Sequence, residues 1–275
     1  TNYGWNGVYL VRSVIDANSF TVQLYGKPTD ANPAGAIAVS RANKFITLCG
    51  AGEINVNGTG QTVSGSPETF GINFVNVYRP TCRDLKLTRG KKYVINFARC
   101  AYSTVADIEL DTDSDGVHWQ GGAWGVHVSN ISGKSGDDFV GFTGGDYSYY
   151  TQGKGDFDGI VIDGLFPRSC IYAVKFTGND QHRYGNVSVS NVSRVADHGA
   201  IFAQNDTDQD SVRMDLLSVS NVRVTSLDPA WANIFLRAIE VVRLDINNVF
   251  AMHANQMQVN VDTPTAVGSL SISNM

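Results

Sequence analysis

The chain has 275 residues, of which 43% are hydrophobic and only 17% charged, and it contains 28 glycines and 7 prolines. This composition is typical of a folded domain with a substantial core, and it excludes intrinsic disorder and a collagen-like rod. The formal net charge of -5 argues against binding to nucleic-acid backbones, and no stretch approaches 18 consecutive apolar residues, so we expect neither a nucleic-acid partner nor membrane insertion.

The first part of the chain is irregular and has a turn-rich break from Lys27 to Pro33. We expect residues 1–44 to form a small N-terminal cap or the end of a preceding domain. Strand-like sequence begins at Phe45, so we expect residues 45–275 to form one repeating domain. Because repeat domains need their open ends covered and Met275 ends a repeat unit, we expect this domain to be truncated at its C-terminus.

One repeat has an apolar residue, any residue, and then an aromatic residue. Its copies are Ile72–Phe74, Ile95–Phe97, Val117–Trp119, Val140–Phe142, Val174–Phe176 and Ala200–Phe202, spaced by 22 to 34 residues. The period of two within each copy is that of a strand and not of a helical solenoid. Stacked copies would place the aromatic rings in the interior.

A second repeat, apolar-x-apolar-x-Asn-apolar, alternates with the first. Five of its six clear copies carry asparagine at the fifth place, at Asn130, Asn191, Asn221, Asn248 and Asn274. Stacking coils about 4.8 Å apart would let these side chains hydrogen-bond along the axis of a parallel β-helix. The alternative all-β fold, a sandwich, gives no reason for asparagine to recur at one point. The sequence therefore predicts an all-β parallel β-helix.

The cysteines Cys49, Cys82, Cys100 and Cys170 show no metal-binding spacing. Each lies beside apolar, strand-like sequence, so we expect buried free thiols. Two disulfides are the alternative if the protein is secreted. No cofactor or metal motif is present, and we expect neither.

Counting back from the aromatic repeat gathers titratable residues on neighbouring coils. Asp115 and Asp138 fall at the same place on adjacent coils, and Asp137 lies beside Asp138. Three carboxylates this close cannot all ionise freely, so at least one pKa should be raised. A raised carboxylic acid beside an ionised carboxylate suits hydrolysis of a glycosidic bond. Strict alternation would point Asp115 inward with Val117, so we expect a bend at Gly116.

These residues resemble a known family. Asp113-Ser-Asp-Gly116, Gly136-Asp-Asp138 and Asp197-His-Gly199 are similar to the N-T-D-G, G-D-D and G-H-G motifs of polygalacturonase-type glycoside hydrolases, whose fold is a right-handed parallel β-helix of the pectin-lyase-like type. The resemblance implies hydrolysis with inversion, with Asp137 as general acid and Asp115 and Asp138 activating the water.

The chain as a whole resembles bacteriophage tailspike depolymerases, which share this fold. The resemblance implies a homotrimer on the virion tail that acts outside the host cell on a capsular or lipopolysaccharide glycan.

Candidate substrate-binding residues surround the acids. They are His118, Lys92, Tyr172, Arg168, Lys175 and His198, together with Tyr147 and Tyr149 in the longest insertion, where tyrosines could stack on sugar rings.

Two other functions remain open from the residues. A polysaccharide lyase needs a cation or Ca²⁺ and a base, for which Lys92, Tyr172 and His198 are candidates. A non-catalytic glycan-binding spike or adhesin segment would use the aspartates as turn formers.

Overall fold

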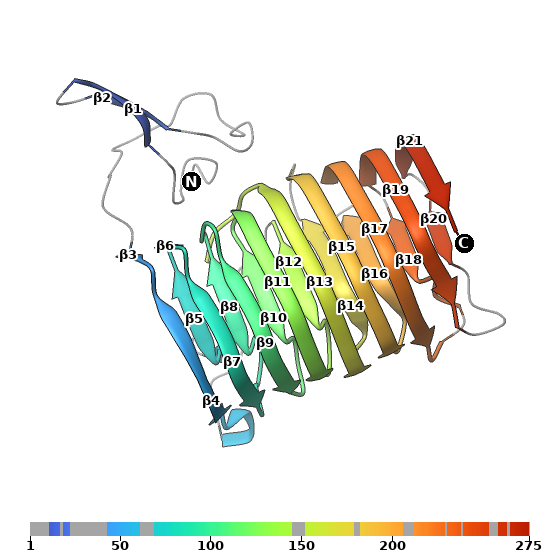
Figure 1. The fold of residues 1–275 in the computed structure, drawn as a ribbon, viewed down its shortest axis with the longest axis horizontal. Helices are drawn as coiled ribbons and strands as arrows, with labels where there is room; N and C mark the ends of the chain where they lie inside the picture. Colours follow the sequence, from blue (N-terminus) through green and yellow to red (C-terminus); the bar gives the residue numbers. More distant parts are fainter. Residues whose placement is uncertain are drawn as a thin grey trace.

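Each coil of the chain adds one strand to each of two parallel sheets, and the coils stack into a parallel β-helix (Figure 1). The computed structural model describes residues 11–16, 19–22, 43–60, 69–144, 152–178, 182–205, 212–228, 230–237, 239–252, 258–262 and 265–274. The predicted all-β parallel β-helix is confirmed. A sandwich is excluded because its sheets are antiparallel, whereas both long sheets here are parallel.

The eight-stranded sheet contains β5 (Ile72–Val75), β8 (Ile95–Ala98), β10 (Val117–Gln120), β12 (Val140–Thr143), β14 (Tyr172–Gly178), β16 (Gly199–Asn205), β18 (Ile234–Arg237) and β20 (Val259–Asp262). The nine-stranded sheet contains β4 (Thr47–Asn55), β7 (Thr81–Thr88), β9 (Thr104–Asp111), β11 (Ala123–Lys134), β13 (Phe157–Ser169), β15 (Arg183–Ala196), β17 (Val212–Ser226), β19 (Ile239–Ala251) and β21 (Ala266–Ser273).

Smaller elements lie toward the N-terminus of the chain. Strand β3 (Asn43–Lys44) pairs in parallel with β6 (Val77–Tyr78), and β1 (Val11–Asp16) pairs in antiparallel fashion with β2 (Ser19–Val22). One 3-10 turn, η2, spans Gly58–Gly60. Among the described residues, no helix is long and apolar enough to cross a membrane.

Aromatic rings fill the interior, as the first repeat predicts. Five rings on successive coils lie nearly parallel, with centroids 4.8–5.2 Å apart: Phe74, Phe97, Trp119, Phe142 and Phe176. Offset stacking of this kind adds to the free energy gained by burying the rings. The Trp119 indole also donates a hydrogen bond to the Ser103 hydroxyl over 2.8 Å, which satisfies its one polar atom in the core.

Three of the repeat asparagines, Asn191, Asn221 and Asn248, form the predicted ladder, whereas Asn130 donates to Asp107 and Asn274 donates to Asn247. The five repeat asparagines lie where the nine-stranded sheet bends, in one column with Asp84, Asp107 and Gly164, and the whole column has positive φ. Short polar side chains and glycine tolerate this left-handed conformation. Asn248 donates to Asn221 over 2.6 Å and Asn221 donates to Asn191 over 3.1 Å, so the side chains connect the coils along the axis.

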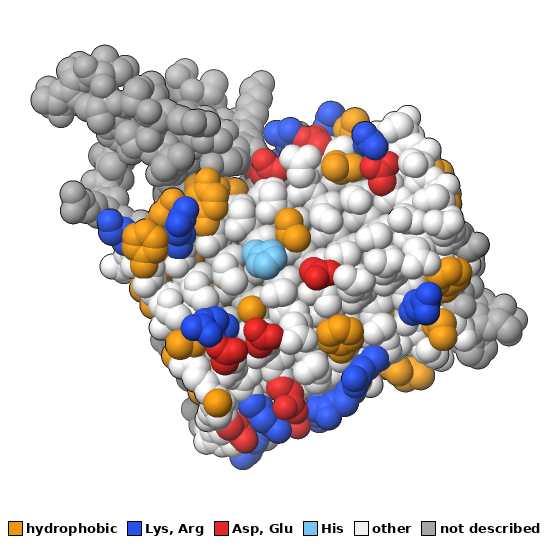
Figure 2. Space-filling model, viewed as in Figure 1, with side chains coloured by type: hydrophobic (Ala, Val, Ile, Leu, Met, Phe, Trp, Pro, Cys, Tyr) orange, Lys and Arg blue, Asp and Glu red, His pale blue; other side chains and the backbone are white. Residues whose placement is uncertain are grey.

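The outer face of the nine-stranded sheet is polar. Figure 2 shows charged side chains gathered along two borders of this face, with mostly uncharged groups between them. Ion pairs along the borders join neighbouring coils, such as Lys86 with Glu109 and Arg213 with Glu240. Because these pairs are solvent-exposed, each contributes little to stability.

The register predicted for the last copy of the first repeat is wrong by one residue. The repeat aligned Ala200 with the inward-facing Val174 of the preceding coil. Ile201, not Ala200, pairs with Val174, so Ala203 points into the core and Phe202 points outward. The interior aromatic stack therefore ends at Phe176. This slip moves an aromatic ring from the core to the outer face of the eight-stranded sheet, because successive side chains of a strand point to opposite faces.

The four cysteines are free thiols, as expected, and three of them are buried. Cys49 is exposed, so its predicted burial is wrong. It lies on β4, which is an edge strand of the nine-stranded sheet among the described residues, and pairs with Arg83.

Candidate active site

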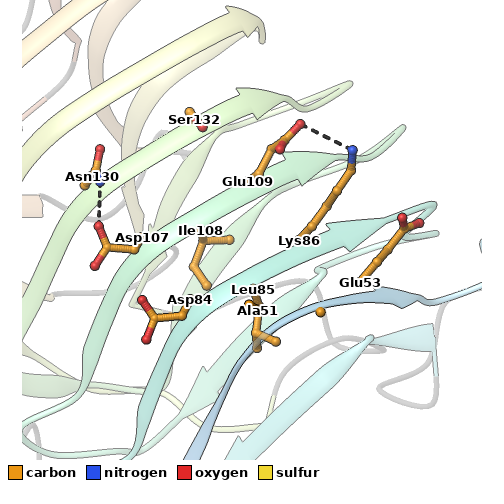
Figure 3. Close-up of a pocket in the computed structure, with 11 residues that line it drawn as sticks. Ala51, Glu53, Asp84, Leu85, Lys86, Asp107, Ile108, Glu109, Asn130 and Ser132 are labelled. Atoms are coloured by element: carbon orange, nitrogen blue, oxygen red, sulfur yellow. Dashed lines mark hydrogen bonds and ion pairs between the residues drawn. The ribbon is translucent and has the colours of Figure 1, made fainter.

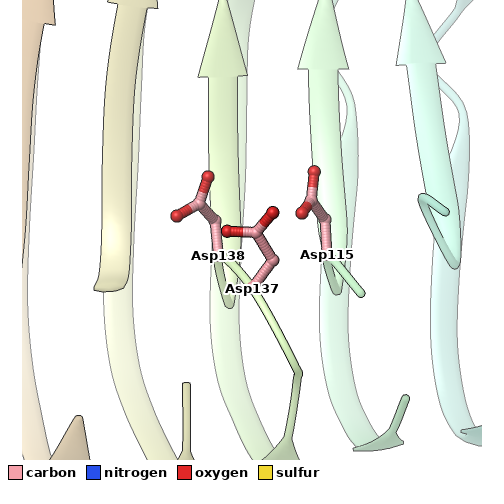
Figure 4. Close-up of side chains that lie close together, drawn as sticks. All are labelled: Asp115, Asp137 and Asp138. Carbon is pink, nitrogen blue, oxygen red and sulfur yellow. The ribbon is translucent and has the colours of Figure 1, made fainter. Parts of the chain in front are cut away.

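The three predicted acids lie together on two neighbouring coils. Asp115 precedes β10, Asp137 and Asp138 precede β12, and one carboxylate oxygen from each lies within 4.8 Å of the others. Figure 4 shows the Asp137 carboxylate between those of Asp115 and Asp138. The register places Asp115 and Asp138 side by side because Val117 pairs with Val140.

Gly116 makes the bend that directs Asp115 outward. It lies in a bend immediately before β10, and a Cβ at this position would come 2.5 Å from the Phe139 carbonyl oxygen. Only glycine allows the coils to approach this closely. The Asp115 side chain therefore turns toward the outer face, where it meets His118.

Asp115 is held by a lysine and a histidine. Lys92 Nζ lies 3.6 Å from its Oδ2, and His118 Nδ1 lies 3.4 Å from the same oxygen. The other ring nitrogen of His118, Nε2, hydrogen-bonds the Thr143 hydroxyl over 3.0 Å, and the ring stacks on Tyr93 with centroids 3.8 Å apart. These contacts fix the orientation of the imidazole against the carboxylate.

Asp138 pairs with Lys175 on the next coil, where Lys175 Nζ lies 3.2 Å from Asp138 Oδ2. Asp137 is more exposed than its two neighbours and faces Asp115 (Figure 4). The cluster therefore combines three carboxyl groups with two lysines. One retained proton would make this set of charges neutral.

The environment separates the pKa values of the three acids. Burial raises the pKa of Asp115, but His118 and Lys92 outweigh it and lower this pKa to about 2. Burial and the Asp115 charge raise the pKa of Asp137. Burial raises the pKa of Asp138 well above its ordinary value. The charge of Lys175 opposes this rise, whereas the two neighbouring carboxylates add to it. Asp115 is thus the acid that ionises first, and of the other two Asp138 has the larger rise in pKa.

Two of the acids are less exposed than a simple outward position suggests. Asp115 and Asp138 are 3% and 4% exposed, and His118 is 4% exposed. The two lysines and His118 cover the carboxylates, while Asp137, Lys92 and Lys175 retain partial exposure. Solvent therefore reaches this cluster at Asp137 and at the two lysines.

Two buried carboxylate oxygens in the cluster have no hydrogen-bond partner among the described residues. They are Asp115 Oδ1 and Asp138 Oδ1. Such groups are rare in folded proteins and are commonly satisfied by water or a ligand.

The three carboxylates form a donor set that could hold a hard cation such as Ca²⁺ or Mg²⁺. Lys92 and Lys175 already supply two positive charges at 3.6 and 3.2 Å from these carboxylates. A divalent cation would have to displace or repel these ammonium groups. The expected absence of a metal stays a prediction.

The other predicted binding residues fall into three groups. Lys92, Lys175 and His118 lie against the acids. Tyr172 and His198 lie on the adjoining coils, where the Tyr172 hydroxyl and His198 Nδ1 are 3.1 Å apart. Arg168 lies on β13 of the other sheet and pairs with Glu109 at 3.5 Å. Tyr147 and Tyr149 lie outside the described residues.

The predicted position of His198 in the stack of coils is wrong. Counting from Ala200 places His198 in the Asp138 column, but Tyr172 pairs with Gly199, so Gly199 occupies that column. His198 instead continues the Asp137 column, because its amide donates to the Ile171 carbonyl and the Ile171 amide donates to that of Asp137.

Sequence reasoning missed several residues that shape the site. Tyr93 and Thr143 hold the His118 ring. Gln152, at the end of the long insertion, contacts the same outer face through Asn96 and Gln120. The signal for Tyr93 was its place in the Asp115 column. Thr143 and Gln152 had no signal, because hydrogen bonds between coils cannot be read from spacing alone.

A concave region lies on the nine-stranded sheet, away from the acid cluster. It is a hollow of about 450 Å³ whose lining includes Glu53, Asp84, Lys86, Asp107, Glu109 and Asn130 (Figure 3). Its acids are already engaged, since Glu109 pairs with Lys86 at 3.4 Å and Asp107 accepts a hydrogen bond from Asn130 over 2.5 Å. The described acids that line this hollow therefore do not form a cluster like that of Asp115, Asp137 and Asp138.

Comparison of the chain with protein-family models, with curated proteins and with solved structures gave no match. The fold defines a class of structure, the parallel β-helix proteins. Any function must be argued from the acid cluster, since a fold does not by itself imply an activity.

Proposed function

We propose that the protein is a glycoside hydrolase that depolymerises a bacterial surface polysaccharide, either capsule or O-antigen. The observation that carries the proposal is the acid cluster, in which three carboxyl groups on adjacent coils have their pKa values separated by their surroundings. Acid and base roles are commonly assigned from such a separation. The tailspike resemblance of the sequence supplies the substrate class.

In the proposed reaction Asp137 is the general acid. It is the most accessible of the three carboxyl groups and has a raised pKa, so it can retain a proton for the leaving glycosidic oxygen. Asp115 is ionised and can orient a water molecule through its unpartnered Oδ1. Asp138 flanks the same position, and Lys175 limits the charge that accumulates there.

The stereochemical outcome is a separate test. Inverting glycosidases separate their two carboxyl groups by about 6.5–9.5 Å and retaining ones by about 5–5.5 Å. The family resemblance of the sequence implies inversion. Proton NMR of the first product decides between the two, because it reports the anomeric configuration.

The activity is tested with a panel of purified capsular polysaccharides and O-antigens, using release of reducing ends as the assay. We expect at least one glycan to be shortened by the wild-type protein. Asp137→Asn should lower the rate by at least a hundredfold, since a positioned acid contributes about 10²–10⁴-fold. Asp111→Asn is the matched control, because Asp111 pairs with Lys134 on the other sheet.

The outcomes separate the three candidate functions. An ultraviolet-absorbing unsaturated product in place of a hydrolytic one would assign the protein as a lyase. Glycan binding without any shortening after long incubation would assign it as a binding segment. Undiminished cleavage by Asp137→Asn would remove that residue from the mechanism.

The proposal includes assembly and location. Tailspike-type enzymes act as homotrimers on the virion tail, outside the host cell. Light scattering in solution should accordingly give three times the mass of the chain, and a monomeric mass would contradict this part alone.

A further inference from the structure

An aromatic group stands on the outer face of the eight-stranded sheet, beside the acid cluster. Tyr172, Phe202 and Phe235 project from β14, β16 and β18, and their rings stack with centroids 4.5 and 5.4 Å apart. They form a hydrophobic cluster separate from the core. The corresponding outward column of the earlier coils carries polar groups such as Asn96 and His118, so the change to aromatic residues is local.

Trp231 and His198 form the exposed part of this group. Their rings stack at a centroid distance of 4.3 Å, and both residues are partly exposed, whereas the three rings that Trp231 meets edge-on are nearly buried. A turn fixes Trp231, because its amide donates to the Asp228 carbonyl and the Ala230 amide donates to the Asp228 carboxylate. The turn positions the Trp231 backbone, and the contacts with the four neighbouring rings position its indole.

Register places the Trp231–His198 pair in line with the proposed general acid. Backbone hydrogen bonds link Asp137 to Ile171 and Ile171 to His198 on successive coils, and Trp231 lies one coil further on. Three coil steps separate Trp231 from Asp137 by about 14 Å along the helix axis. This separation corresponds to a few sugar units of an extended glycan.

We propose that Trp231 and His198 form a sugar-binding subsite that takes the apolar face of a pyranose ring, so that the polysaccharide runs along the helix axis from this pair to Asp137. The proposal rests on the proposed function for its substrate class. Sugars present a ring of C–H groups that packs on aromatic faces, and a few polar groups at the rim fix their orientation. The Tyr172 hydroxyl, beside His198, supplies such a group.

The test measures binding and cleavage separately. Titration calorimetry with the same panel of capsular polysaccharides and O-antigens, in the Asp137→Asn background, gives affinity without cleavage. We expect Trp231→Ala to weaken binding at least tenfold and Trp231→Phe to weaken it less, since the latter keeps a ring. Phe250→Ala is the matched control, a partly exposed aromatic residue on β19 of the other sheet.

A second readout distinguishes a subsite from a structural role. Trp231→Ala should raise KM for the intact polymer more than for a fragment too short to span three coils, because remote contacts act only on substrates that reach them. A purely structural defect would affect both substrates equally and would lower the melting temperature of Trp231→Ala while sparing Trp231→Phe.

The possible failures are distinguishable. Unchanged affinity in both Trp231 variants, or no binding of any glycan in the panel, overturns the subsite. Cleavage that is insensitive to Trp231 overturns it while leaving the hydrolase proposal intact. Glycan binding that depends on Trp231, with no cleavage by the wild-type protein, supports the subsite and overturns the hydrolase proposal.

Discussion

His118 is the residue through which the neighbouring coils act on Asp115. It contacts Asp115 with one ring nitrogen and Thr143 with the other. His118→Phe keeps the ring packed on Tyr93 but removes both polar contacts. If Asp115 acts in the proposed reaction, we expect kcat to fall roughly 10–100-fold, because small misplacements of a catalytic group have effects of this size.

The pH–rate profile identifies the cause of this loss. The contact with His118 lowers the pKa of Asp115, so its removal should move the acidic limb of the profile to higher pH. Thr143→Val is a milder variant than His118→Phe, since it removes only the hydrogen bond at His118 Nε2, and it should shift the acidic limb less. A fall in kcat with an unmoved acidic limb would contradict a role through Asp115.

Lys175 is expected to set the alkaline limb of the same profile. In the proposed reaction the general acid Asp137 must be protonated, so its raised pKa predicts activity that persists above the ordinary range of an aspartate and falls as pH rises through that pKa. Lys175 opposes the rise. Lys175→Met should therefore move the alkaline limb upward by about one pH unit.

The control for this prediction is Lys86→Met, because Lys86 pairs with Glu109 on the other sheet. Its profile should match that of the wild-type protein. A downward shift in Lys175→Met would show that the lysine does not act on the acids by its charge.

At the scale of the element, the bends of the nine-stranded sheet depend on backbone conformation as well as on side-chain hydrogen bonds. Asn221 has a φ of 55° and exchanges hydrogen bonds with the asparagines on both neighbouring coils. Asn221→Ala should cost about 1–2 kcal/mol from the left-handed conformation. Asn221→Gly removes the same hydrogen bonds without that strain and should cost less. Urea unfolding of the full chain measures both.

Gly164 supports this expectation, since it occupies the same column with a φ of 78° and has no side chain. The Asp163 carboxylate takes over there and accepts a hydrogen bond from Asn191 over 2.6 Å. Equal losses in Asn221→Ala and Asn221→Gly would mean that the hydrogen bonds, and not the backbone, carry the stability of the bend.

The repeats predicted the elements well where the coils are regular. Coils of 22 or 23 residues carry both signals, and the inward rings from Phe74 to Phe142 follow the expected register. The register was also correct across the longest insertion, where Val140 pairs with Val174, and it failed at the following coil. Near Ala200 three consecutive apolar residues, Ala200 to Phe202, allow two registers, and only the packing of Ile201 on Val174 and Ile234 selects one.

The same limit applies to the site. The gathering of Asp115, Asp137 and Asp138 followed from counting, because each lies within one regular coil of the next. The burial of two acids and the aromatic group around Trp231 did not follow, because both depend on long side chains and turns contributed by other coils.

At the scale of the molecule, the stacked coils should respond locally to damage in the core. Trp119 is fully buried in the middle of the ring stack, and Trp119→Ala should cost about 3–5 kcal/mol. Because each coil contacts mainly its neighbours, hydrogen exchange should rise in β8, β10 and β12 and stay low in β17 and β19.

Trp119→Phe gives the smaller step, since it keeps a ring in the stack and loses the hydrogen bond to Ser103. Its cost should be clearly below that of the alanine variant. A uniform rise of hydrogen exchange over all described strands would show that the molecule unfolds as one unit.

The division of the site between coils has a consequence for how such molecules diversify. Asp115 and Asp138 meet only because one whole coil, and no more, separates them. Insertion of a duplicated coil between them would leave the scaffold intact and still abolish the proposed hydrolysis. A coil added beyond Trp231 would instead lengthen the surface available to the proposed polymer without disturbing the acids. Such scaffolds can therefore change the reach of their surface freely on one side of the acids, while the spacing between the acids stays fixed.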